Sequence, residues 1–217
     1  MSIDDEDIDK QVVDELYWDN SVSAADVAVT VEDGIVTLKG TVPSYRAKVT
    51  ASEDAYDVAG VVLVENQLKV EYPKQLTDSE IKSNVTNALS WDFDLDSQKI
   101  RVTVNNGDVK LLGTVDAYWK KMIAETDVSK VKGVRNIKNE IAIVPTNERE
   151  DEHIAKDVEE ALRRKWLVDV NDVDVRVEHG FVTLTGDVPS RLARTEADEA
   201  AIYTDGVKAV ENKLAIG

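Results

Sequence analysis

One stretch of the chain combines aromatic and basic side chains in a pattern that suits an anionic surface. The run Ala117-Tyr-Trp-Lys-Lys-Met places Trp119 beside Lys120 and Lys121 at the expected start of a helix. At a lipid interface an aromatic ring seats in the headgroup layer while an ammonium group meets phosphate. Each lysine near an anionic surface contributes about 1 kcal/mol. The predicted ligand surface consists of Trp119, Lys120, Lys121, Lys130, Lys132 and Arg135.

A second candidate site is acidic. The run Asp92-Phe-Asp-Leu-Asp-Ser places three carboxylates, those of Asp92, Asp94 and Asp96, at alternate positions. A calcium-binding EF-hand loop needs Gly at its sixth position and Glu at its twelfth, where this chain has Ser97 and Thr103. We therefore interpret the run as a solvated loop between a helix and a strand, and a loose cation site is the weaker alternative.

Residues for catalysis are scarce. The chain has no Cys, which excludes disulfides, thiolate metal sites and cysteine nucleophiles. Its two histidines, His153 and His179, have no sequence partners that indicate a catalytic triad. No glycine-rich phosphate-binding motif occurs. The sequence predicts no catalytic residues, no enzyme activity and no cofactor.

The charge of the chain is strongly negative and unevenly distributed. Its 217 residues carry a net charge of −17, so we expect no nucleic-acid partner. Residues 1–73 carry 16 acidic against 5 basic side chains, residues 74–146 carry 10 against 11, and residues 147–217 carry 17 against 10, giving net charges of −11, +1 and −7. The favoured interpretation of the basic middle region is docking against its acidic neighbours, ahead of an anionic ligand surface.

An internal repeat with a period of 73 residues organises the chain. The repeated positions include three sets of glycines and one set of asparagines: Gly34, Gly107 and Gly180; Gly40, Gly113 and Gly186; Gly60, Gly133 and Gly206; Asn66, Asn139 and Asn212. No insertion interrupts the repeat from the first helix to the last strand. The spacing predicts three tandem modules with boundaries at residues 1–73, 74–146 and 147–217.

Each module has the pattern helix, strand, strand, helix, strand. A stripe at four-residue spacing, Ile8, Val12 and Leu16, predicts the first helix, with Asp5 as an acidic N-cap. Alternating apolar residues predict two strands joined by a short loop that ends in Gly34. The crossover through the second helix predicts a last strand parallel to the second strand. The predicted fold class is α+β: three tandem αββαβ modules, each with two helices packed on a mixed three-stranded sheet.

Two further sets of residues have predicted roles within the modules. The asparagines Asn66, Asn139 and Asn212 are expected to tie the last strand to neighbouring backbone groups. The tryptophans at the ends of the first helices, Trp18, Trp91 and Trp166, are expected to plug the local core. The alternative for Trp91 is that it joins Phe93 in a membrane-facing patch.

These residues resemble the BON domain, the family named for bacterial OsmY and nodulation proteins. The resemblance rests on the strand pair Val27-Ala-Val-Thr-Val-Glu-Asp-Gly-Ile-Val-Thr-Leu-Lys-Gly-Thr-Val, the alanine-bearing helix and the closing Val64-Glu-Asn-Gln-Leu-Lys-Val, in all three modules. It implies a non-enzymatic role in phospholipid or membrane-associated binding and in osmotic and other stress responses. A related protein that pairs a BON module with a LysM module implies potassium binding as an alternative.

The leading hypothesis is a stress-linked binding protein with affinity for anionic phospholipid. The alternatives are a potassium-binding sensor and a scaffold that binds other proteins. The apolar runs are too short to span a bilayer, so no transmembrane segment is expected. The acidic start of the chain lacks the basic and apolar regions of a signal peptide. We therefore expect a cytoplasmic location, or a periplasmic one if the natural protein carries an export signal.

Overall fold

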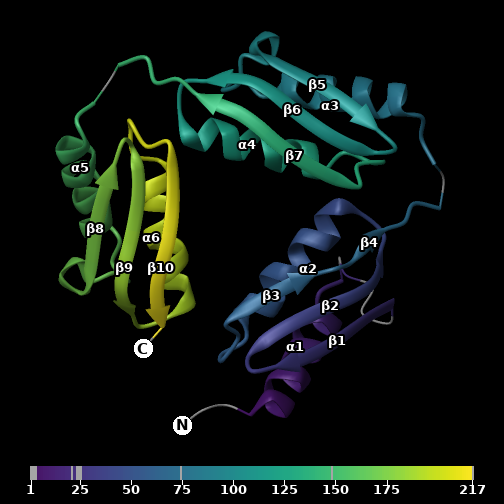
Figure 1. Cartoon of the computed structure of the whole chain (residues 1–217), viewed down its shortest axis with the longest axis horizontal. Coiled ribbons are helices and arrows are strands. Elements are labelled where there is room, and N and C mark those ends of the chain that lie inside the picture. Colours follow the sequence, from purple (N-terminus) through teal and green to yellow (C-terminus); the bar gives the residue numbers. More distant parts are fainter. Residues whose placement is uncertain (1–3, 21, 23–25, 74, 148, 217) are drawn as a thin grey trace. The chain divides into compact units, whose positions relative to one another are not determined.

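The computed structural model describes residues 4–20, 22, 26–73, 75–147 and 149–216. It confirms the predicted fold class, because each module contains two helices that pack on a mixed three-stranded sheet (Figure 1). The described residues form six α-helices: α1 (Asp5–Trp18), α2 (Tyr45–Asp57), α3 (Asp78–Trp91), α4 (Tyr118–Ser129), α5 (Asp151–Arg163) and α6 (Arg191–Ile202).

The strands follow the predicted order within each module. They are β1 (Val27–Glu32), β2 (Ile35–Val42), β3 (Leu63–Asn66), β4 (Lys69–Val70), β5 (Ile100–Asn105), β6 (Asp108–Val115), β7 (Asn136–Ile143), β8 (Val173–Glu178), β9 (Phe181–Val188) and β10 (Ala209–Ile216). The sheet orders are β1-β2-β3, β5-β6-β7 and β8-β9-β10. The last strand runs parallel to the central one in the first and third modules, as predicted, and in the first module it is split into β3 and β4.

The chain divides into two compact units. One contains residues 1–91, 102–111 and 126–138, and the other contains residues 92–101, 112–125 and 139–217. The middle module therefore contributes segments to both units.

The hairpin turns are held by a carboxylate at the start of each first helix. Asp5 accepts hydrogen bonds from the backbone N–H groups of Asp33 (2.8 Å) and Gly34 (3.0 Å). Asp78 does the same for Asn106 and Gly107, and Asp151 for His179 and Gly180. The first helices do begin at Asp5, Asp78 and Asp151, but the predicted N-cap role of Asp5 was wrong, because its carboxylate binds the turn instead.

The turn that these carboxylates hold has an uncommon backbone conformation. Asp33, Asn106 and His179 have φ angles of 52°, 52° and 54°, and the glycines that follow also have positive φ. Two consecutive positive φ angles between antiparallel strands define a type I′ hairpin turn, in which an Asn-Gly or Asp-Gly pair is favoured. The carboxylate of the first helix thus binds backbone N–H groups that the turn leaves without strand partners.

The asparagines join the last strand to the second helix, as predicted. The Asn66 side-chain amide donates to the Lys48 carbonyl oxygen (2.6 Å), and its Oδ1 accepts from the N–H of Leu68 (3.0 Å). The other two modules repeat both bonds, with Asn139 donating to Lys121 and Asn212 to Arg194. The asparagine therefore satisfies backbone groups of both elements.

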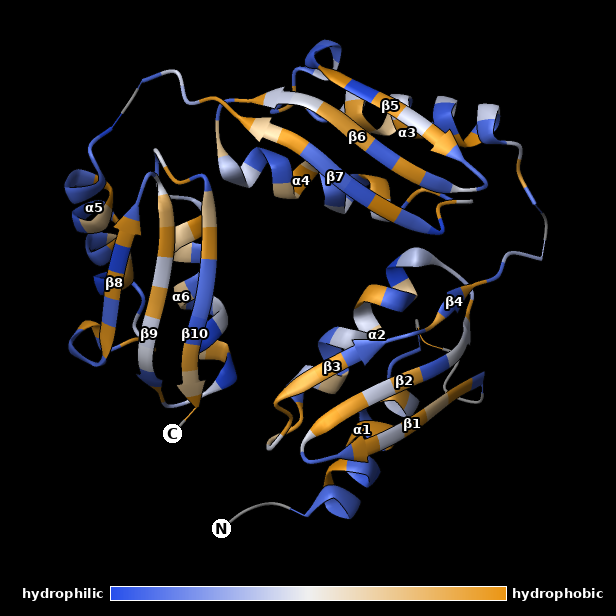
Figure 2. Cartoon of the chain, in the orientation of Figure 1, coloured by the Kyte–Doolittle hydropathy of each residue, from blue (hydrophilic) through white to orange (hydrophobic). Residues whose placement is uncertain are grey.

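The core of each module lies between the helices and the sheet, and Figure 2 shows the strands alternating between apolar and polar residues. The first-helix stripe is buried, with Ile8, Val12 and Leu16 at most 2% exposed. The small residues Ala47, Ala51 and Ala55 are also buried, so α2 lies close to the sheet as predicted. Val29 and Val31 are only half-buried, because β1 is an edge strand.

Replacing Leu111 with Ala should lower the free energy of unfolding by about 2–5 kcal/mol, because it leaves a cavity in a core position that is 0% exposed. Urea denaturation followed by circular dichroism measures the change. The control is Leu192→Ala, at a position 59% exposed, which should change the free energy by less than about 0.5 kcal/mol. Equal effects would mean that the alternation of the sheet has been assigned to the wrong face.

The two hydrogen bonds that Asp151 accepts from the hairpin turn should make the stability of the third module depend on pH. Hydrogen bonds from the His179 and Gly180 backbone amides hold the pKa of Asp151 below its usual value. A lowered folded-state pKa gives stability that is present above the unfolded-state pKa and is lost as pH falls through the folded-state pKa. We expect Asp151→Asn to lower the denaturation midpoint at pH 7, and the difference from the wild type to shrink as acid protonates the carboxylate, below the usual carboxyl pKa. Glu152→Gln, in the same helical turn, is the control and should leave the midpoint unchanged at neutral and at acidic pH.

Candidate functional site

The start of α4 brings together Trp119, Lys120 and an acidic partner. The Lys120 ammonium lies 2.8 Å from Asp116 Oδ1 and 5.3 Å from the centre of the Trp119 ring. The hydrogen bond from Lys120 is the main cause that lowers the pKa of Asp116. Lys120 occupies the repeat position of the buried Ala47 and Ala193, and its side chain is only 23% exposed. Its charge is therefore largely balanced within the module.

The neighbouring aromatic residues contact the third module. The ring of Trp119 stacks on Tyr203 with a centroid distance of 6.0 Å and an interplanar angle of 23°. Tyr118 packs against the core cluster of the third module. These contacts support the docking interpretation of the α4 start, although the contact with Tyr203 is aromatic rather than an ion pair.

The other predicted ligand residues have different surroundings. Lys121 is half-buried, and its carbonyl oxygen accepts the bond from Asn139. Lys130 pairs with Asp127 at 3.1 Å. Arg135 lies just before β7, and its N–H donates to the Gly107 carbonyl oxygen (2.9 Å). Lys132 is exposed.

The predicted ligand surface is divided between the two compact units. The unit that contains residues 112–125 holds Trp119, Lys120 and Lys121, and the other unit holds Lys130, Lys132 and Arg135. Within the first of these groups, the Lys120 ammonium contacts the Trp119 ring. That these six residues form a single ligand surface therefore stays a prediction.

The aspartates of the acidic loop serve the backbone and a neighbouring lysine. Asp92 Oδ1 accepts the N–H of Asp94 (2.8 Å), which forms a local turn, and Asp96 pairs with Lys99 (3.2 Å). Within the part of the chain that the structure describes, no three His, Cys, Asp or Glu side chains form a group that could hold a metal ion. The structure thus does not bring Asp92, Asp94 and Asp96 together as a metal site.

The tryptophans at the ends of the first helices are on the surface, so their prediction as core plugs was wrong. Trp18, Trp91 and Trp166 are 77%, 82% and 87% exposed. Trp18 and Trp91 each follow a buried leucine by two residues, which is about 200° around a helix and therefore on the opposite face. Phe93, two residues beyond Trp91, is fully exposed at 104%. The first-helix ends thus present large apolar side chains to solvent.

A cavity marks the corresponding end of the third module. It has a volume of about 610 Å³, and both the loop after α5 and the segment that leads into α6 contribute to its lining. Among the lining residues are Arg163, Trp166, Asp169, Val188 and Pro189. The end of the first helix, the loop after it and the end of the central strand with Pro189 therefore share one surface, which we call the open end of the module.

The fold and the repeat define the class of the protein as a tandem array of αββαβ modules. The chain belongs to the BON-domain family, whose model matches residues 4–72, 77–145 and 150–217. No helix among the described residues has both the length and the apolar character needed to cross a membrane.

Two curated proteins are similar to this chain. "Osmotically-inducible protein Y" of Escherichia coli (strain K12) is 29% identical over 145 residues, covering 64% of this chain and 72% of that protein. "Outer membrane lipoprotein DolP" of Haemophilus influenzae is 30% identical over 140 residues, covering 62% and 72%. Among solved structures, the C-terminal domain of CdsD from Chlamydia trachomatis covers 99% of this chain and 100% of its own, with 16% identity and a TM-score of 0.26, a likeness that carries no argument about this chain.

Acrylamide quenching in solution should distinguish the three exposed tryptophans from the half-buried Trp119. In four variants that each keep one tryptophan and replace the other three with Phe, acrylamide should quench Trp18, Trp91 and Trp166 several-fold more strongly than Trp119. The reason is that the first three rings are 77–87% exposed, whereas Trp119 is half-buried against Tyr203. Stern–Volmer constants measure the difference. Equal constants for all four rings would contradict the exposed positions of the first-helix tryptophans.

Proposed function

We propose that the chain is a non-enzymatic, stress-associated binding protein that associates with anionic phospholipid surfaces through the open end of its middle module. The observation that carries this proposal is the exposure of Trp91 and Phe93, which lie two residues apart at the end of α3. Single apolar residues on a surface are common, but two large exposed ones this close in the sequence favour contact with a membrane or a partner.

Charge selects the middle module among the three. All three modules expose an aromatic ring near the end of the first helix, but the first and third carry net charges of −11 and −7. As whole modules those two are repelled by an anionic bilayer, whereas the middle one carries +1 and eleven basic residues. The carboxylates of Asp92, Asp94 and Asp96 flank its aromatic pair, so the proposed attraction comes from basic residues outside this loop. Moving a Phe-sized side chain out of water contributes about 1.5–3 kcal/mol, and each nearby lysine contributes about 1 kcal/mol.

The lysines at the start of α4 supply part of the proposed attraction. In the third module Pro189, just before α6, lines the cavity, and its repeat position in the middle module is Asp116. Lys120 and Lys121 follow Asp116 by four and five residues, and we assign them to the open end of the middle module on this spacing. Lys121 is the stronger candidate because Lys120 pairs with Asp116. We propose that the remaining basic residues attract the anionic surface from a distance and do not join the direct contact made by the aromatic rings. These residues are Lys130, Lys132 and Arg135.

The names of the relatives support this function. One is described as osmotically inducible and the other as an outer membrane lipoprotein, which favours a stress role and a membrane surface for this chain. They give no support to the expected cytoplasmic location, and we propose a location at the cell envelope instead. Potassium sensing and protein scaffolding stay alternatives from the sequence, and no contact among the described residues favours potassium.

Vesicle co-sedimentation tests the proposal. The wild type should pellet with phosphatidylglycerol vesicles at low salt, less at physiological salt and not with phosphatidylcholine vesicles. Replacing both Trp91 and Phe93 with Ser should reduce the bound fraction several-fold. The matched control is Trp18→Ser, which removes an equally placed ring from an acidic module and should leave binding unchanged.

Charge reversal separates the aromatic and basic contributions. Changing Lys120 and Lys121 to Glu alters the local charge by four units and should abolish binding at physiological salt. If the wild type fails to pellet with anionic vesicles even at low salt, the lipid proposal is wrong. If only the charge reversal has no effect, the aromatic patch holds and the assignment of the two lysines is wrong.

A further inference from the structure

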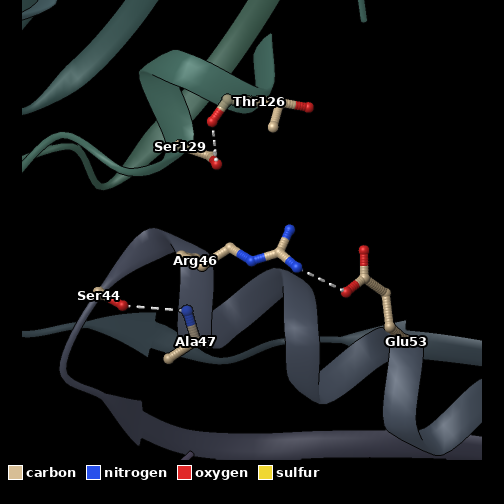
Figure 3. Close-up of polar contacts among 6 residues, drawn as sticks. All are labelled: Ser44, Arg46, Ala47, Glu53, Thr126 and Ser129. Atoms are coloured by element: carbon tan, nitrogen blue, oxygen red, sulfur yellow. Dashed lines mark hydrogen bonds and ion pairs between the residues drawn. The ribbon is translucent and has the colours of Figure 1, made fainter. Parts of the chain in front are cut away.

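The seam between α1 and α2 in the first module is lined by acidic side chains. Asp54 lies on α2, is half-buried, and its Oδ2 is enclosed without a hydrogen-bond partner among the described residues. The charged groups that act on it are four carboxylates, those of Glu15 on α1, Asp19 just after α1, and Glu53 and Asp57 on α2. A cation on the same helix, Arg46, pairs with Glu53 at 3.4 Å (Figure 3). The seam therefore holds a partly desolvated carboxylate among like charges.

In the middle module a cation neutralises the aspartate at the position equivalent to Asp54. The repeat relates Asp54 to Asp127 and Asp57 to Lys130. Lys130 lies 3.1 Å from Asp127 Oδ1, so the aspartate there has an opposite charge one helical turn away. In the first module that position carries Asp57, which is a reversal of charge at an unchanged place in the fold.

The third module has a different but equally balanced seam. The position of Asp54 is the buried Ala200, and the position of Asp19 is Lys165. Lys165 connects the end of α5 to α6 through Glu196 (2.8 Å) and Glu199 (3.4 Å). Where the third module joins its two helices with a lysine, the first module places a carboxylate.

The acidic seam makes the stability of the first module depend on protonation. Burial, and then the negative charges of Asp19, Asp57, Glu15 and Glu53, raise the pKa of Asp54 to about 6. A carboxyl whose folded-state pKa is raised binds its proton more tightly in the folded state, so folding is favoured as pH falls. The window lies between about pH 7 and the unfolded-state value near 4.

We propose that the α1–α2 seam of the first module is a proton-operated latch, weakened at neutral pH by the charge on Asp54 and tightened when this carboxyl is protonated. The latch is specific to the first module, because the middle and third modules balance the same seam with Lys130 and Lys165. It gives the protein a structural response to mild acid. The proposal does not depend on lipid binding.

Hydrogen exchange on the full chain tests the latch module by module. After correction for the intrinsic rate, the protection of amides in α1 and α2 should rise about three- to ten-fold from pH 8 to pH 5, the upper value being that of a single carboxyl with a pKa near 6. Protection in α3 and α4, where Asp127 is paired with Lys130, should stay constant over the same range. Asp54→Asn should raise the protection of α1 and α2 at pH 8 and remove its pH dependence.

Two further variants keep the test decisive. Asp127→Asn, the matched control at the same repeat position, should not increase protection in α3 or α4, because it removes an ion pair instead of a repulsion. Asp57→Lys copies the arrangement of the middle module and should flatten the pH dependence of α1 and α2, as Asp54→Asn does. The latch proposal is overturned if wild-type protection in α1 and α2 is independent of pH, or if its pH dependence survives in both Asp54→Asn and Asp57→Lys.

Discussion

Each module depends on one carboxylate that joins its first helix to its hairpin. Asp5, Asp78 and Asp151 each accept two backbone N–H groups from a turn whose first residue has a positive φ. A strand pair closed by such a turn has a fixed register, and register decides which side chains face the helices. The carboxylate therefore positions the first helix over the face of the sheet that its apolar stripe must cover. A module of about 70 residues has little surplus stability, so a contact that fixes register and helix position together matters to the whole module.

This contact between carboxylate and turn, which we call the clamp, gives each module two ends that differ in how much their sequence varies. At the clamped end the turn conformation, the aspartate that starts the helix and two of the three glycine sets, those of Gly34 and Gly60, are the same in all three modules. At the open end all three modules share the bond from the asparagine amide to a backbone carbonyl near the start of the second helix, but they present different side chains. There the modules differ in charge and in aromatic residues, from Tyr17 and Trp18 through Trp91 and Phe93 to Arg164 and Trp166. A surface that varies on a constant frame is where differences in ligand or partner are expected.

Much of the fold could be predicted from the sequence because it depends on periodic features. The spacing of Ile8, Val12 and Leu16 located the first helix, and the 73-residue repeat located every copy. The carboxylate clamp was missed because it joins residues 28 and 29 positions apart, a contact that no local pattern reports. The exposed tryptophans were missed although a signal existed, since Trp18 and Trp91 lie two residues after a stripe leucine and so face away from it. The repeat also held a signal for Lys120, which takes the place of the buried alanines at positions 47 and 193.

One repeat position shows how the modules diverge without a change of fold. It is occupied by Asp57 in the first module, Lys130 in the second and Tyr203 in the third, at or just beyond the end of the second helix. Asp57 adds negative charge to the acidic seam, Lys130 neutralises Asp127, and Tyr203 stacks on Trp119. All three side chains lie outside the core of alanines and first-helix residues, so their exchange leaves the packing intact. The same backbone position thus sets the charge of a seam in one module and an aromatic contact in another, which is how three copies of one fold can respond differently to protons and to surfaces.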